Sequence, residues 1–121
     1  MSDAARERVW LALSELWLDT ELDDADLRRI ADALRTSALP PAELEAIYLH
    51  EVAPVLWLNA WSVAGVWSGF DPDWLFEHCQ RNQVRRASRW FRWRCRLLRR
   101  PMTYANREQW QQVIHRVVED T

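Results

Sequence analysis

The sequence predicts an all-α protein, built as a single compact domain of five or six helices. Helix-forming residues (Ala, Leu, Arg and Glu) recur along the whole chain, and apolar residues recur at spacings of three and four. The chain has only two glycines and five prolines, too few for the many turns of a β-sandwich. A length of 121 residues, 49% of them apolar, is typical of one globular domain, so residues 1–121 are expected to fold as one unit.

The first two helices are predicted over residues 3–18 and 24–36. Ser2 or Asp3 can cap the first helix, and Asp23 is a good N-cap for the second. Acids in the first turn of the second helix also suit the positive end of its dipole. Apolar side chains give each helix one buried face, which is Val9, Trp10, Leu13, Leu16 and Trp17 in the first and Leu27, Ile30, Ala31 and Leu34 in the second.

Prolines and glycines divide the middle of the chain. Pro41 fits the first turn of a third helix, and Pro54 is expected to end or kink that helix, because its ring removes a donor and crowds the preceding turn. Residues 55–70 contain no charged residue. They are expected to form a buried fourth helix that loosens near Gly65 and stops at Gly69.

The Asp-Pro-Asp sequence at 71–73 is a strong helix start, because it combines an acidic cap, a proline at the first position and an acid in the first turn. A helix is predicted over residues 72–82, and the pattern leaves open whether it continues to Arg100. Pro101 is expected to end it. A last amphipathic helix is predicted over residues 105–119.

The net charge of −2 hides a division between two parts of the chain. Residues 1–78 hold five arginines and fifteen acids, a balance of −10, whereas residues 79–121 hold eleven arginines and three acids, a balance of +8. Such asymmetry suggests an interaction with another molecule. The alternative is that the two parts neutralise each other within one domain.

The most basic segment is residues 81–100, which contain nine arginines and no acid. It is predicted to be an amphipathic helix. Its expected apolar stripe is Val84, Ala87, Phe91, Cys95 and Leu98, widened by Trp90, Trp93 and Leu97. Such a helix suits a nucleic-acid backbone, an anionic membrane surface or an acidic protein. It also fits an outer helix whose charge is neutralised within the molecule.

The acidic counterpart is the turn at residues 19–26. Its five acids are Asp19, Glu21, Asp23, Asp24 and Asp26. A calcium loop is excluded, because the glycine and the glutamate that such a loop needs are missing. The turn is interpreted either as helix capping or as a surface that contacts a basic partner, where it would act on association rate and specificity.

Nine tryptophans cannot all occupy the centre of so small a core. One or two are expected at the surface, and exposed Trp beside Arg is typical of binding hot spots. Trp90 and Trp93 are the best candidates. Together with Arg85, Arg89 and Arg92 they complete the partner-binding residues predicted for the basic segment.

No catalytic or metal-binding pattern is complete. Pro54 stands where a His-Glu-x-x-His motif starting at His50 needs its second histidine, and Ser68 is one place late for a Gly-x-Ser-x-Gly motif. Glu51, beside Tyr48 and His50, is interpreted as part of a hydrogen-bonded core cluster rather than the remnant of a site. We therefore expect binding rather than enzyme activity, with no metal and no cofactor.

Two cysteines are too few for a disulfide framework, which fits a reducing cytoplasm. The first residues lack the apolar run of a signal peptide, and no stretch is apolar enough to span a membrane. A cytoplasmic location is expected.

Three stretches resemble an uncharacterised family of small stand-alone proteobacterial proteins. They are SELWLDTEL at 14–22, EVAPVL at 51–56 and AGVWSGF at 64–70, and the resemblance covers roughly residues 9–78. In size and style the chain is also similar to immunity proteins that neutralise bacterial toxins. The resemblance implies a small cytoplasmic immunity or antitoxin-type protein that occludes the active surface of a toxin. The alternatives are an Arg-rich module that binds nucleic acid and a helical protein with a structural or regulatory role.

Overall fold

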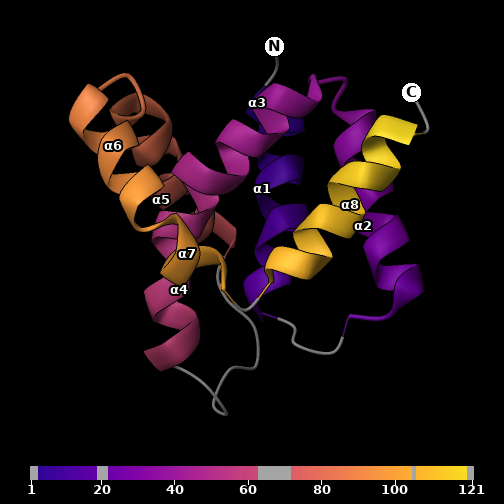
Figure 1. The fold of residues 1–121 in the computed structure, drawn as a ribbon. Coiled ribbons are helices and arrows are strands. Elements are labelled where there is room, and N and C mark those ends of the chain that lie inside the picture. The colour runs from indigo at the N-terminus through magenta and orange to yellow at the C-terminus, as the bar shows by residue number, and fades with distance from the viewer. Residues whose placement is uncertain (1–2, 19–21, 63–71, 105, 120–121) are drawn as a thin grey trace.

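The computed structural model describes residues 3–18, 22–62, 72–104 and 106–119, and all of its regular elements are helical within those ranges (Figure 1). The helices are α1 (Asp3–Leu18), α2 (Asp24–Thr36), α3 (Pro41–Ala46), the π-helical segment η1 (Ile47–Val52), α4 (Ala53–Ser62), α5 (Pro72–Arg85), α6 (Arg89–Leu97), α7 (Arg99–Thr103) and α8 (Arg107–Glu119). Because α3, η1 and α4 follow one another directly, they form one long rod. The all-α prediction is confirmed.

The η1 segment lies at the centre of the domain, where it contacts α1, α5 and α6 as well as its own neighbours in the chain. In Figure 1, α2 and α8 lie side by side at one end, and α5 and α6 lie at the other. All six η1 residues are buried, which matches the contacts that η1 makes on several sides. These contacts make η1 the central element of the packing.

The third helix, expected to end or kink at Pro54, changes type there: the π-helical η1 ends at Val52 and α4 begins at Ala53. The expected helix end at Pro101 is wrong, because α6 already ends at Leu97. Pro101 lies inside α7, as its third residue, where a backbone N–H would have no partner within the helix. Gly65 and Gly69, the expected end of the fourth helix, lie outside the described residues.

The basic segment spans parts of three helices rather than one: the end of α5, the whole of α6 and the start of α7. The helix predicted over 72–82 extends to Arg85, and α6 then begins at Arg89 with the Ser88 hydroxyl accepting from Phe91 N–H at 3.5 Å. The break reverses part of the expected apolar stripe: Val84 is 74% exposed and Ala87 is exposed as well. Cys95 is buried, as expected.

Tryptophans divide between the core and the surface as the sequence suggests. Trp10, Trp17 and Trp110 are buried, and their indole N–H groups donate to Glu51, to the Met102 carbonyl and to Glu45 at 2.7–2.9 Å. A buried indole needs such a partner. Trp90 and Trp93 are 78% and 58% exposed, which confirms the expectation of surface tryptophans.

Candidate interaction surface

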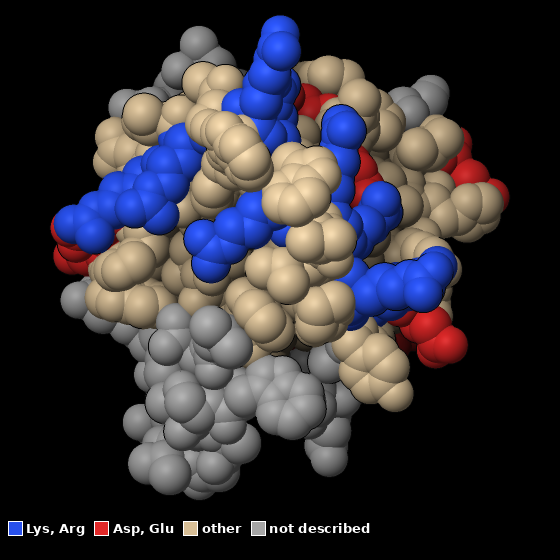
Figure 2. Space-filling view, turned by 60° about the vertical axis from the view of Figure 1, so that its left-hand side comes forward, with Lys and Arg blue, Asp and Glu red and all other residues tan. Residues whose placement is uncertain are grey.

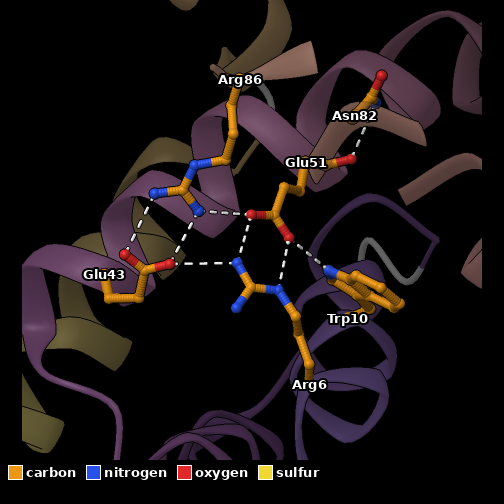
Figure 3. A network of polar contacts seen from close by, with 6 residues as sticks. All are labelled: Arg6, Trp10, Glu43, Glu51, Asn82 and Arg86. Carbon is orange, nitrogen blue, oxygen red and sulfur yellow. Dashed lines mark hydrogen bonds and ion pairs between the residues drawn. The ribbon is translucent and has the colours of Figure 1, made fainter. Parts of the chain in front are cut away.

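The charged centre of the molecule is a network in which two arginines and two glutamates bind one another (Figure 3). Glu51 is fully buried, and its carboxylate accepts from Arg6 at 3.1 and 2.6 Å and from Arg86 at 2.6 Å. Trp10 Nε1 donates to the same carboxylate at 2.9 Å. Because four hydrogen bonds from protein donors already bind this carboxylate, it is not available to a ligand.

Glu43 completes the network from α3. Arg86 donates to both of its carboxylate oxygens, at 2.8 and 3.1 Å, and Arg6 donates to one of them at 3.1 Å. The hydrogen bond from Arg86 is the main cause that lowers the pKa of Glu43, and the same contact raises the pKa of Arg86. The network therefore holds α1, α3, η1 and the end of α5 together.

The expected core cluster around Glu51 is confirmed as to its burial and hydrogen bonding, but its partners differ. Tyr48 donates instead to Asn106 at 2.6 Å. His50 is buried with no hydrogen-bond partner for Nδ1 among the described residues, and burial, with nearby Arg86, lowers its pKa. Tyr48 and Glu51, three residues apart, would be neighbours on an α-helix, but η1 is π-helical, and the two side chains bind different partners.

The acidic turn binds its own molecule. Asp23 caps α2 by accepting from Asp26 N–H at 2.8 Å, and Asp26 in return accepts from Asp23 N–H and from Arg29. Asp24 is paired with Arg28 and Arg116. Asp19 and Glu21 lie outside the described residues. The described part of the turn thus forms the capping arrangement that was one of its two interpretations.

Most arginines of the basic part of the chain, residues 79–121, are in the opposite situation. Four of the eleven arginines after residue 79 form ion pairs: Arg81, Arg86, Arg99 and Arg116. The other seven have no carboxylate partner among the described residues, and they are Arg85, Arg89, Arg92, Arg94, Arg96, Arg100 and Arg107. Intramolecular neutralisation of the two parts of the chain is therefore incomplete.

Helical geometry arranges these cations around α6. At 100° per residue, Phe91, Cys95 and the following Leu98 point inward, six other positions form two outer strips, and Arg94 lies between the apolar strip and the inward side. One strip is purely cationic and consists of Arg89, Arg92 and Arg96. The other is apolar and consists of Trp90, Trp93 and Leu97, all exposed. We call these two strips the basic face.

The basic face has the residue types of a recognition surface. Trp90 and Trp93 lie edge to face, with ring centroids 6.0 Å apart and planes at 87°. Figure 2 shows Arg side chains spread around a centre of uncharged residues on this side of the molecule, with acidic side chains at its margins. Five predicted residues, Arg85, Arg89, Trp90, Arg92 and Trp93, are all exposed here or at the adjoining end of α5.

A groove of about 480 Å³ lies beside this face, between α5 and α6 and over the start of α4. Its walls include Arg81, Arg85 and Arg94, and its apolar lining includes Trp57 and Phe91. Sequence reasoning did not single out Arg94 or this groove. The signal that was available is Ser88, a good N-cap in the middle of the basic segment, which marks the break between α5 and α6.

Neither cysteine presents a reactive thiol at the surface. Cys79 and Cys95 are free and buried, and burial raises the pKa of both thiols, that of Cys95 to about 11. The described residues contain no cluster of His, Cys, Asp and Glu able to hold a metal ion. A search of the described helices for a long, apolar membrane-crossing segment finds none.

Comparison with known proteins identifies the family. The family model for a domain of unknown function, DUF7079, matches residues 4–116. The chain belongs to this family. The expected membership of an uncharacterised family is confirmed, and the match extends beyond residue 78 to include α5, α6 and most of α8. No curated protein and no solved structure matches the chain.

Proposed function

We propose that this protein is a cytoplasmic immunity or antitoxin-type protein, which neutralises a toxin by covering its active surface. It acts by binding and not by catalysis. The observation that supports this proposal is the basic face, where three exposed arginines without carboxylate partners among the described residues lie beside two exposed tryptophans. Arg and Trp dominate the energetics of protein interfaces.

The basic face, rather than the acidic turn, is the contact surface in this proposal. Carboxylates that already bind arginines of the same molecule would have to leave those partners before they could bind another protein. Unpaired guanidinium groups need no such exchange, and they form bidentate hydrogen bonds with carboxylates. The toxin surface that fits is therefore acidic, with apolar pockets for Trp90 and Trp93.

Growth rescue tests the proposal. The product of the reading frame adjacent to this gene is expressed in bacteria, and co-expression of the protein should restore growth if that product is the toxin. Arg92→Glu should abolish the rescue, whereas Arg8→Glu, an equal charge change at an exposed position of α1, should leave it intact. Trp93→Ala should weaken the rescue, with Tyr104→Ala, also strongly exposed, as its control. Rescue that survives both basic-face changes would contradict the proposal.

Nucleic-acid binding is the second candidate, because the basic face carries several cations and no acid. Exposed aromatic rings beside arginines also suit stacking on single strands. The affinity of a labelled oligonucleotide should then fall steeply with salt, with a logarithmic slope of about −0.7 per neutralised phosphate for a single strand. No band shift at low salt would end this alternative.

A further inference from the structure

The groove between α5 and α6 is a hollow lined by several helices, whereas the basic face is the exposed surface of one helix. Four helices line the groove: α4 contributes Val55 and Trp57, α5 contributes His78 and Arg85, α6 contributes Phe91 and Arg94, and α7 contributes Met102. A volume of about 480 Å³ is within the range typical of ligand-binding pockets. It is large enough for one aromatic or aliphatic side chain from a partner.

The charges around the groove all have one sign. Arg81, Arg85 and Arg94 line it, and no Asp or Glu is among its lining residues. Arg81 is engaged by Glu77 at 2.8 Å, but Arg85 and Arg94 have no carboxylate partner among the described residues. A ligand that places negative charge beside these two guanidinium groups would therefore form its ion pairs without breaking existing ones.

The lining of the groove is apolar between those charges. Phe91 and Trp57 are partly buried against the core, and Val55 and Cys95 beside them are buried. Apolar surface that remains in contact with water is stabilised when another apolar group covers it. The complementary ligand thus combines an apolar centre with anionic flanks.

We propose that this groove binds an acidic peptide segment of the partner protein, whose single apolar side chain enters between Arg85 and Arg94. The inference deepens the proposed function and rests on it, since it names the chemistry of the toxin segment that is recognised. A peptide fits better than a nucleic acid, because the two exposed tryptophans suited to base stacking lie on the outer strips of α6, away from the groove lining.

Fluorescence anisotropy with short labelled peptides tests the groove directly, without the toxin. The first probe has one Trp between pairs of Glu, the second has Ala in place of Trp, and the third has Lys in place of Glu. The Trp probe should bind about tenfold tighter than the Ala probe, the ratio expected for burial of one large apolar side chain at roughly 1.4 kcal/mol or more. The Lys probe should not bind.

Variants of the protein locate the binding. Arg94→Glu should weaken the Trp probe by about tenfold or more through loss of one ion pair and gain of a like charge. Arg94→Gln should weaken it less. Arg107→Glu should change it little, because Arg107 lies outside the groove and, within the described part of the chain, has no carboxylate partner. Circular dichroism of each variant confirms that the fold is kept, since Arg94 is exposed and makes no ion pair with the described residues.

Several results would overturn the inference: equal binding of the Trp and Ala probes, no effect of Arg94→Glu, or displacement of the peptide by an oligothymidine at lower concentration. The outcomes also separate the two proposals. Peptide binding with failed growth rescue supports the groove and rejects toxin neutralisation. Growth rescue without peptide binding rejects the groove and leaves the proposed function standing.

Discussion

Two arginines belong to the buried network around η1, whereas three others lie on the exposed outer side of α6. Arg6 is 7% exposed and binds two glutamates, and Arg86 binds the same two. A few residues further along the chain, Arg89, Arg92 and Arg96 are exposed and bind no carboxylate of the described residues. The difference shows that charge count alone does not reveal which arginines are available for recognition.

Several acids of the first part of the chain pair with arginines of the second. Glu43, Glu45, Glu51 and Asp24 each bind an arginine from beyond residue 79, so the acidic part of the chain does neutralise part of the basic one. It does so around the rod and at α2, α7 and α8. The outer side of α6 receives no such compensation from the residues that the structure describes, and that is what makes it a candidate surface.

The largest effect should follow from removal of the central carboxylate. Glu51→Ala leaves Arg6 and Arg86 without their shared buried partner, and loss of one member of a buried pair reduces the free energy of unfolding by about 3–5 kcal/mol. Urea denaturation measures this change. Glu7→Ala, on the same helix as Arg6 but outside the network, should stay within about 0.5 kcal/mol. Equal stability of the two variants would remove the distinction between the centre and the surface.

Acid should weaken the same network. The pKa of Glu43 lies below its ordinary value of 4.5, so its contribution to stability is complete above that pH and is lost as the pH falls through the lowered pKa. Unfolding free energy should therefore fall below about pH 4.5. Glu43→Gln should show a smaller fall over the same range. The effect should be weaker than that of Glu51→Ala, because Glu43 is partly exposed.

The acidic turn should show a smaller, purely structural effect. Asp23→Ala removes the cap of α2 and should reduce the free energy of unfolding by about 1 kcal/mol. Asp23→Asn keeps a capping oxygen and should recover most of that loss. If the turn serves only as a cap, growth rescue by Asp23→Asn should equal that of the wild type. A loss of rescue with stability intact would return the acidic turn to the contact surface.

The smallest effect on stability should come from the basic face. Replacement of Arg89, Arg92 and Arg96 by Gln removes no ion pair with the described residues, so each change should alter the free energy of unfolding by less than about 0.5 kcal/mol. Relief of repulsion between like charges three and four residues apart should even raise stability slightly. Thermal unfolding at low salt measures this. A clear loss of stability would mean that these arginines have a structural role after all.

Local chemistry explains what the sequence predicts well. The α2 helix begins after Asp23 and buries Leu27, Ile30, Ala31 and Leu34, as expected, because its cap and its apolar spacing are properties of adjacent residues. The helix starts at Pro41 and Pro72 follow from the same kind of signal. Exposure of Trp90 and Trp93 followed from counting how many indoles a small core can hold.

Long-range contacts account for the features that could not be predicted. Glu51 meets Arg6 and Arg86 across 45 and 35 residues of sequence, and no local spacing encodes that meeting. The basic segment divides after Arg85, near the point where Arg86 binds Glu43 and Glu51, although periodicity left open whether one helix continued to Arg100. Ser88 signals the break locally, but the groove depends on how α5 and α6 pack against α4, which no spacing in the sequence encodes.

Arg86 immediately follows α5 and precedes α6 by three residues, and its guanidinium links the turn between these two helices to Glu43 of α3 and Glu51 of η1. A substitution at either glutamate should therefore alter the position of α6 as well as the centre of the protein. The outward arginines of α6 are thus mechanically coupled to a buried carboxylate that they do not touch.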